Sequence, residues 1–360
     1  LAGLRILEMA GIGPGPFCGM MLADHSAEVI RVERPGASGL TEAARDPLLR
    51  SRRTITLDLK KPEAIAAVRR IATTCDGLIE GFRPGVMERL GLGPEVLIAD
   101  NPKLVYGRMT GWGQTGPLAK EPGHDIDYIA ISGTLHALGE AGGKPVAPIN
   151  LVGDFGGGGM MLAFGMLAAV LKAQATGQGQ VVDCAMTDGS AALASMIWGF
   201  RAMGRWSGER GTNLLDGGAH FYGTYETADG KWIAVGAIEP QFYAALRRVM
   251  GLDGGEWDAQ FAPASWPRLK AELADRFKLR TRDGHEACVA PVLGFDEAVA
   301  HPHNVARATF VTAGGITQPA PAPRYSVSAT VPPRMAGAPD GAAILAEAGF
   351  TPAEIAALRF

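Results

Sequence analysis

The segment LRILEMAGIGPGP, residues 4–16, decides how the first half of the chain is expected to fold. Its short apolar run breaks into alternating glycines and prolines, which is the pattern of a buried strand, a tight turn and a helix that starts with proline. A second apolar segment, AEVIRVERPG at residues 27–36, carries Glu33 near its end. A strand, a glycine-rich turn, a helix and a second strand ending in an acid are typical of dinucleotide-binding folds.

Two features of these segments weigh against a dinucleotide. The binding motif needs three glycines, and Gly11 and Gly13 fit, but Pro16 occupies the third position. Proline suits the first turn of a helix, so the strand–turn–helix interpretation survives while the pyrophosphate cradle is weakened. Glu33 is followed at once by Arg34, which is either a solvated cation or one that suits a phosphate-bearing ligand. An NAD-dependent oxidoreductase is therefore disfavoured.

Strand-like and helix-like segments alternate through the first half of the chain. Apolar spacing predicts a helix over residues 62–75 and two short helices within residues 83–103. Alternation of this kind predicts βαβ units. We therefore expect an α/β fold with a Rossmann-like large domain and a mostly parallel sheet, whose strands lie near residues 5–10, 27–33, 54–60, 77–82 and 103–112.

The pattern changes near residue 220. Two alternating runs flank Asp229 and Gly230 within residues 221–237, which predicts a β-hairpin, and helices are expected over 240–252 and 265–277. These elements predict a smaller α+β domain. We expect a large domain over residues 1–200, a linker over 201–219, the small domain over 220–312, a second linker over 313–324 and a return of residues 325–360 to the large domain.

Composition narrows the function classes. The chain of 360 residues is 47% apolar and 20% charged, as in globular enzymes, and its net charge of −3 gives no bulk attraction for nucleic acid or an anionic membrane. The longest apolar run, residues 160–171, would span about 18 Å as a helix against roughly 30 Å of hydrocarbon core, so we expect a buried core helix. No CxxC pair occurs, which argues against a zinc site or a disulfide framework and favours a reducing compartment such as the cytoplasm; the cysteines are Cys18, Cys75, Cys184 and Cys288.

Two stretches carry residues suited to chemistry. His124 lies in EPGHDIDY (121–128), on an expected loop, and Asp154 lies in NLVGDFGGGGMMLAFG (150–165). A lone histidine is more often structural, and an aspartate at a helix start is often only a cap. The glycines at 156–159 favour function, because each costs about 0.5–1 kcal/mol relative to alanine and capping needs none of them. Bare backbone there would admit a ligand, with helix N–H groups facing an anion.

Several long motifs identify a family. In these motifs the chain resembles the 2-methylacyl-CoA racemases, which have the family III CoA-transferase (CaiB/BaiF-like) fold. The resemblance runs from residue 3 to near residue 309, and its motifs are GWGQTGP (111–117) with PGHDIDY (122–128), LVGDFGGGG (151–159), GQGQVVDCAMTDG (177–189), NLLDGGAHFYGTYE (213–226) and AVGAIEPQFY (234–243). It implies an interlocked homodimer, an acyl-CoA substrate and a place in fatty acid and lipid metabolism.

The resemblance also implies a mechanism. The family's activity is isomerisation of (2R)- and (2S)-2-methylacyl-CoA by 1,1-proton transfer through an enolate. His124 and Asp154 would be the two acid/base groups, and Glu239 would hydrogen-bond the histidine. We expect N–H groups of the glycine-rich helix start beyond Asp154 to stabilise the enolate oxygen. No metal or redox cofactor is implied, and CoA would be held by Arg34, Leu57, Asp58, Leu59, Lys60, Gly123, Asp125, Ile126, Asp127 and Tyr128.

Two residues depart from the family's usual pattern. Asp127 stands where asparagine is usual, which adds a carboxylate near the histidine, and Ser26 stands where a turn glycine is usual. The first departure bears on the charge around His124, and the second bears only on the conformation of a turn.

The nearest alternative is a CoA-transferase of the same fold. There Asp154 would be a nucleophile that forms a mixed anhydride and then a covalent thioester. Such transferases carry a polyglycine loop where this chain has Ile238, Glu239 and Pro240, so the racemase is favoured. A non-catalytic CoA-binding protein is a further alternative, which would leave the combination of acid/base residues without a reason.

Overall fold

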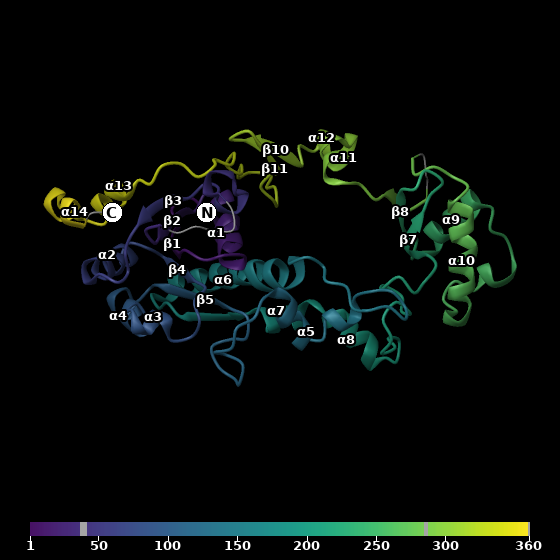
Figure 1. The fold of residues 1–360 in the computed structure, drawn as a ribbon, viewed down its shortest axis with the longest axis horizontal. Helices are drawn as coiled ribbons and strands as arrows, with labels where there is room; N and C mark the ends of the chain where they lie inside the picture. Colours follow the sequence, from purple (N-terminus) through teal and green to yellow (C-terminus); the bar gives the residue numbers. More distant parts are fainter. Residues whose placement is uncertain (37–41, 284–286, 359–360) are drawn as a thin grey trace. The chain divides into compact units, whose positions relative to one another are not determined.

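The computed structural model describes residues 1–36, 42–283 and 287–358. The chain forms two compact units, each built from separate segments (Figure 1). Unit 1 comprises Leu1–Ser132, Ile149–Leu193 and His303–Phe360, and unit 2 comprises Gly133–Pro148 and Ala194–Pro302. These limits differ from the domain boundaries predicted from the sequence. The predicted boundaries concern parts that fold independently, and they stay a prediction.

Unit 1 is built on a six-stranded parallel sheet with the order β3-β2-β1-β4-β5-β6. The predicted α/β fold with a Rossmann-like sheet is confirmed, and of these strands only β6 was not predicted. The order reverses between β1 and β4, and open sheets of this kind bind ligands outside the carboxyl ends of the strands at such a point. The strands are β1 (Arg5–Met9), β2 (Glu28–Glu33), β3 (Arg53–Thr56), β4 (Gly77–Glu80), β5 (Val105–Thr110) and β6 (Val181–Ala185).

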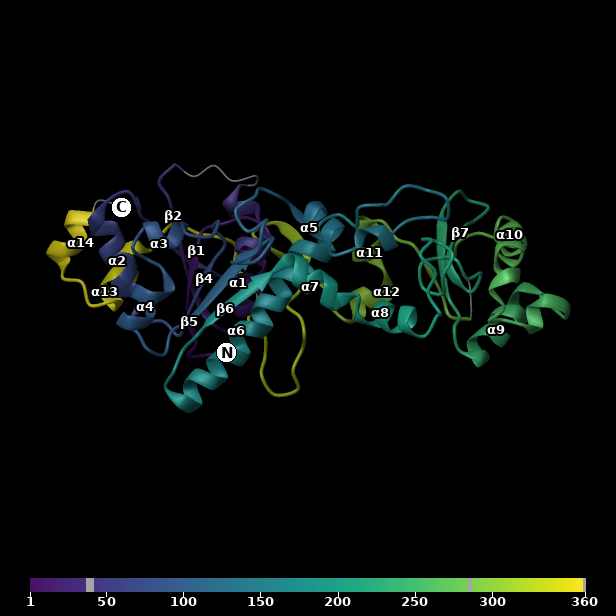
Figure 2. The ribbon, with the colours of Figure 1, turned by 90° about the horizontal axis from the view of Figure 1, so that it is seen from below.

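Helices cover both faces of this sheet (Figure 2). Along β1, Leu7 belongs to the core of one face and Ile6 to the core of the other, because successive strand residues point to opposite sides. The helices predicted within residues 62–75 and 83–103 are confirmed. The Ile6 face carries α1 (Pro14–Asp24) and α6 (Met161–Thr176), and the Leu7 face carries α2 (Pro62–Ala72), α3 (Val86–Arg89), α4 (Pro94–Asp100), α13 (Gly341–Glu347) and α14 (Pro352–Leu358).

A buried ionic cluster holds the turn between β1 and α1. Glu8 is fully buried in β1 and pairs with the guanidinium groups of Arg31 and Arg52. Arg31 also donates to the Gly11 carbonyl at 3.3 Å, and Arg52 donates to the Pro16 carbonyl. Hydrogen bonds to charged groups are roughly twice as strong as neutral ones, so the path of the glycine-rich turn is well determined.

The longest helix of unit 1 starts earlier than predicted. A π-helix over Leu151–Met160 runs directly into α6. The combined helix of 26 residues is long and apolar enough to cross a membrane by length and composition, although 44% of its most apolar window is buried. Leu162 and Met166 are almost fully buried against the sheet. The expectation of a buried core helix is therefore confirmed for its inner face, whereas the expected length is wrong.

Ser26 adopts a left-handed backbone conformation, which favours glycine. It lies in the turn between α1 and β2 with φ 75°, in the left-handed region. A side chain in that region costs about 1–2 kcal/mol, so serine forms this turn at a modest cost in stability.

Unit 2 is built on a three-stranded antiparallel sheet, β7-β8-β9, and the predicted hairpin around Asp229 and Gly230 is confirmed. Its core contains Phe221, Leu246 and Leu273, so α9 and α10 pack on the sheet. The unit 2 elements are β7 (Tyr222–Glu226), β8 (Trp232–Gly236), β9 (Val289–Pro291), α8 (Ser195–Ala202), α9 (Pro240–Met250), α10 (Trp266–Phe277) and α11 (Phe295–Ala300). The remaining elements are α5 (Asp125–Ile131), α7 (Met186–Leu193), α12 (Pro302–Ala306), β10 (Phe310–Ala313), β11 (Ile316–Pro319) and short 3-10 turns at Ala43–Arg45, Pro47–Leu49, Leu135–Ala137, Gly255–Asp258 and Pro263–Ser265.

Candidate active site

The histidine of the predicted acid/base pair is fixed at the start of α5. His124 is the N-cap residue, with an extended backbone at φ −133° and ψ 175°. Its N–H donates to Asp127 Oδ2 at 2.9 Å, so the carboxylate that replaces the family's usual asparagine caps the helix. The imidazole itself is exposed. The backbone therefore holds His124 in place while its side chain stays accessible to a substrate.

Tyr128 ties this junction to the end of β5. A Cβ on Gly111 would lie 2.0 Å from the Tyr128 ring, and one on Gly123 would lie 2.7 Å from it, so only glycine leaves room for the ring. The Tyr128 hydroxyl donates to the Gly123 carbonyl, and Trp112 packs edge-on with ring centroids 4.8 Å apart. Burial raises the pKa of Tyr128 to about 12, which keeps its hydroxyl a donor at neutral pH.

Asp154 lies in the first turn of the π-helix and is half-buried. Asn150 Nδ2 donates to Asp154 Oδ2 at 3.0 Å. Burial raises the pKa of Asp154 and the charge of Asp125 raises it further, whereas the Asn150 hydrogen bond and nearby His124 lower it. The structure thus brings His124 and Asp154 within electrostatic reach of each other, and it favours a carboxyl group that holds its proton to a higher pH than an ordinary aspartate.

The glycine-rich turn after β1 faces this carboxylate. Gly13 has φ 67°, and a Cβ on it would lie 2.9 Å from Asp154 Oδ2. Glycine at this position therefore admits the Asp154 side chain. Glu33, the other element of the dinucleotide pattern, accepts a hydrogen bond from Arg31 Nε at 2.9 Å. The two features that first suggested a dinucleotide are therefore explained by contacts within the protein: the glycine-rich turn lies against Asp154, and Glu33 binds Arg31.

The glycines after Asp154 lie inside the π-helix. Phe155 N–H already donates to the Asn150 carbonyl at 3.3 Å, so the N–H groups that follow are used by the helix. The expectation that they stabilise an enolate oxygen is wrong. A Cβ on Gly157 would lie 2.6 Å from the backbone nitrogen of Ser190 in α7. These glycines admit neighbouring helices, and the expectation that they admit a ligand is wrong as well.

The residues expected to hold CoA divide between two parts of unit 1. Arg34 follows β2 and Lys60 follows β3, and both side chains are exposed. Because β2 and β3 are parallel neighbours, the two cations lie at the same edge of the sheet. Leu57 is buried, Leu59 packs against the core and Asp58 Oδ1 accepts from the Lys60 N–H at 3.1 Å. The other predicted group is at α5, where Ile126 is exposed and Asp125 is buried.

Glu239 lies in unit 2, at the exposed N-cap position of α9. Its predicted hydrogen bond to His124 stays a prediction. Asn150 was missed in the sequence analysis, although it directly precedes the LVGDFGGGG motif and asparagine is common at helix starts. Asp125 was predicted only as a CoA contact, and its hydrogen bond to the Asp154 backbone was missed.

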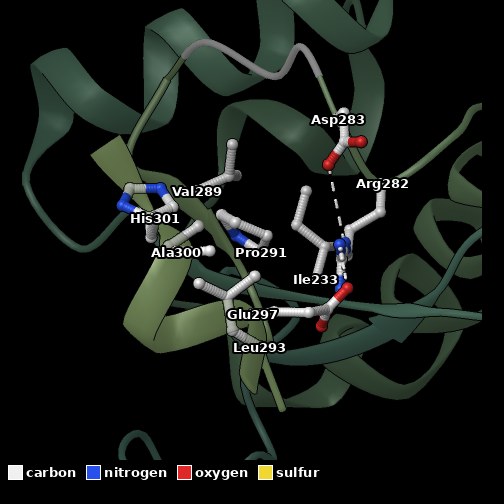
Figure 3. Close-up of a pocket in the computed structure, with 10 residues that line it drawn as sticks. Ile233, Arg282, Asp283, Val289, Pro291, Leu293, Glu297, Ala300 and His301 are labelled. Atoms are coloured by element: carbon white, nitrogen blue, oxygen red, sulfur yellow. Dashed lines mark hydrogen bonds and ion pairs between the residues drawn. The ribbon is translucent and has the colours of Figure 1, made fainter. Parts of the chain in front are cut away.

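A cavity of about 480 Å³ lies in unit 2 beside β8, β9 and α11 (Figure 3). Arg282 lines it and pairs with Glu297 at 2.8 Å and Asp283 at 3.5 Å, so its charge is already balanced. His301 lies at the opposite side of the lining in Figure 3. None of the predicted acid/base or CoA-binding residues lines this cavity. Within the described ranges, no cluster of three side chains suits a metal ion.

The fold and the site together define a doubly wound α/β protein with a histidine–aspartate pair near the carboxyl edge of its parallel sheet. Residues 1–343 match the family described as CoA-transferase family III, and the chain belongs to that family.

Two relatives and one solved structure bear on the activity. The chain is 47% identical to alpha-methylacyl-CoA racemase of Mus musculus over 370 aligned positions, covering 100% of this chain and 96% of the relative. It is 30% identical to succinyl-CoA:glutarate CoA-transferase of Homo sapiens, covering 94% and 83% of the two chains. The crystal structure of a CAIB/BAIF family protein from Brucella suis matches with a TM-score of 0.79 at 26% identity, covering 96% and 98%.

Proposed function

We propose that this protein interconverts the (2R) and (2S) epimers of 2-methylacyl-CoA thioesters by moving the α-proton through an enolate. The observation that carries the proposal is that exposed His124 and half-buried Asp154 lie near enough for the charge of His124 to act on the Asp154 carboxyl. Identity of 47% over the whole chain to a protein named alpha-methylacyl-CoA racemase supports the substrate class.

Inversion of a carbon needs an acid/base group on each side of it. One group removes the α-proton from its face, and the thioester carbonyl takes up the electron pair as an enolate. The conjugate acid of the other group then returns a proton to the opposite face. With neutral His124 and protonated Asp154 the reaction runs in one direction, and with His124⁺ and ionised Asp154 it runs in the other. Each group contributes about 10²–10⁴ in rate.

The first N–H groups of α5 are suited to the enolate oxygen. Hydrogen bonding of this helix begins with the Asp127 N–H, which donates to the His124 carbonyl at 2.8 Å. Among the described residues, no acceptor is found for the N–H groups of Asp125 and Ile126. Removing one such donor typically costs about 10²–10³ in rate, which is why these two positions matter.

The CoA nucleotide and the partner subunit are assigned to different surfaces. Exposed Arg34 and Lys60 at one sheet edge suit the phosphates of CoA. Phe164 and Leu171 on α6 are 71% and 68% exposed, and apolar side chains of this kind favour a homodimer.

We place the protein in the cytoplasm, since the described cysteines are all unpaired.

Deuterium exchange tests the proposal. The (2R) and (2S) epimers of 2-methyldecanoyl-CoA are incubated separately in D₂O, and NMR follows deuterium at the α-carbon while chiral chromatography follows epimerisation. Asp154→Asn and His124→Gln should each lower epimerisation of both epimers by about 10²–10⁴-fold. Each variant should retain exchange for the epimer whose own base remains, because that base still reaches its face.

The control is His303→Gln, which changes an exposed histidine of α12 and should exchange at the rate of the unchanged protein. Absence of exchange from both epimers, together with transfer of CoA to an added carboxylic acid, would make Asp154 a nucleophile. That result would replace the racemase with the CoA-transferase alternative.

A further inference from the structure

Asp125 is buried beside Asp154, and one of its two carboxylate oxygens has no hydrogen-bond partner among the described residues. Its side chain belongs to a residue that is 7% exposed, whereas its neighbours His124 and Ile126 are exposed. Asp125 Oδ1 accepts a hydrogen bond from the Asp154 N–H at 2.7 Å. In the described part of the chain, Asp125 Oδ2 is buried without a partner. An unpaired buried acceptor of this kind is costly, about 1–3 kcal/mol for a neutral group and more for a charged one.

A neighbouring glycine makes room for this carboxylate. A Cβ on Gly153 would lie 2.5 Å from Asp125 Oδ1 and 2.9 Å from its carboxyl carbon. Real Cβ atoms do not approach so closely, and the short aspartate side chain has little freedom to retreat. Gly153 therefore has a specific role within the glycine-rich motif, which is to let Asp125 reach the backbone of the residue that follows.

Simple anchoring does not need a charge at residue 125. An asparagine would offer the same oxygen to the Asp154 N–H and would avoid burying an unpaired ionised group. An aspartate has a second acceptor oxygen where asparagine has a donor, and it adds a negative charge, which lies one hydrogen bond away from the Asp154 backbone. The chemistry proposed above requires Asp154 to hold a proton in one direction of the reaction, and a fixed negative charge nearby favours that form.

We propose that Asp125 is a positioning residue for Asp154. Its carboxylate anchors the first turn of the π-helix through the Asp154 N–H, and its charge favours protonated Asp154, so that Asp154 can return a proton to the enolate. This inference rests on the proposed racemase function for its purpose, although its effect on Asp154 can be measured without turnover.

The other neighbouring groups that shift the pKa of Asp154 favour its ionised form. From α5, His124 favours ionised Asp154, and Tyr128 is close enough for the charge of Asp154 to act on its hydroxyl. Asn150, at the start of the π-helix, donates to the carboxylate and also favours the ionised form. On α7, which packs against the same helix, Asp188 is exposed. Asp125 is thus the buried group of this set that opposes ionisation of Asp154.

The test measures the titration of Asp154 directly. Protein labelled with ¹³C at the aspartate carboxyl carbon is titrated by NMR, and the Asp154 signal is assigned by its loss in Asp154→Asn. In Asp125→Asn the midpoint of Asp154 should fall by roughly one pH unit, because a like charge has been removed while the backbone anchor is kept. Gly153→Ala, which displaces the carboxylate, should shift the midpoint in the same direction.

Activity gives a second readout. In Asp125→Asn, kcat of the direction that needs protonated Asp154 should fall about tenfold above the shifted midpoint, with KM unchanged. The matched control is Asp188→Asn, which changes an exposed aspartate on α7 and should leave the Asp154 midpoint in place. An unchanged or raised midpoint in Asp125→Asn would overturn the proposal. Absence of turnover in the unchanged protein would instead overturn the proposed function, since the titration needs no turnover.

Discussion

The segment at residues 11–15 and the helix at residues 156–159 are two glycine-rich parts of unit 1, and they lie against each other. A Cβ on Gly159 would meet the Pro14 carbonyl at 2.6 Å, so the first turn of α1 rests on the π-helix. The two parts differ in the atoms that a Cβ on each glycine would contact. Gly157 and Gly159 avoid the backbone of neighbouring helices, whereas Gly13 avoids only the carboxylate of Asp154.

This difference separates glycines that build the fold from one that shapes the site. Backbone cannot move aside without shifting a whole helix, so a side chain at Gly157 is a problem of stability. A side chain at Gly13 displaces the Asp154 carboxyl group, which the proposed mechanism requires at the substrate, so we expect it to lower activity. Gly11 and Gly15 have open space around their Cβ positions and avoid nothing. Similar sequence patterns therefore hide three different reasons for glycine.

The largest effect is expected from Gly157→Ala. Its Cβ would lie 2.6 Å from the Ser190 nitrogen, so α7 and the π-helix would have to separate. We expect a loss of about 3 kcal/mol in the stability of unit 1 and a melting temperature lower by roughly 6–12 °C, measured by differential scanning calorimetry. A melting temperature equal to that of the unchanged protein would show that the helix contact yields easily, and the comparison would then fail.

Gly13→Ala is expected to separate activity from stability. The left-handed φ of 67° costs an alanine about 1–2 kcal/mol, which is less than the loss at Gly157. Epimerisation should fall about 10²-fold, and so should deuterium exchange of the epimer that Asp154 deprotonates, because the new methyl group displaces the Asp154 carboxylate. Full exchange activity with lowered stability would contradict the assignment of this glycine to the site.

The smallest effect is expected from Gly15→Ala, which also serves as the control for the other two substitutions. Gly15 lies in the first turn of α1, has no atom within 4 Å of its Cβ position and lacks a positive φ. Alanine there should stabilise the protein by about 0.5–1 kcal/mol and leave exchange unchanged, as calorimetry and NMR can show. A clear loss of either property would mean that glycine-rich stretches of this protein are sensitive as a whole.

Local patterns were enough to predict most of the fold. The strands β1 to β5, the helices α1 to α4 and the hairpin of unit 2 each follow from the spacing of apolar residues and from turn residues such as Asp229 and Gly230. The helix α5 was not predicted, because the residues around His124 were expected to form a loop. The strand β6 was not predicted. In the structure it pairs along its length with its parallel neighbour β5. The start of the π-helix was also missed, because glycines at 156–159 are unfavourable in a helix unless close packing requires them.

The candidate site was only partly readable in the sequence. His124 and Asp154 stand out by their motifs, and the family resemblance assigns their chemistry. The resemblance could not show that the glycines after Asp154 are enclosed by helices, and the enolate-stabilising role expected of them was wrong. Nor could it show that Asp125 is buried against the Asp154 backbone, since two motifs well separated in the chain have to fold together first.

The sequence by itself determined the parallel α/β architecture and the family, and it singled out the candidate acid/base pair, because periodicity and motifs are properties of neighbouring residues. Only the tertiary structure decided why the glycines are where they are and what surrounds Asp154. Those answers depend on the distance between elements that are remote in sequence, such as Gly13 and Asp154. Close packing sets such distances to within fractions of an ångström, and no local pattern encodes them.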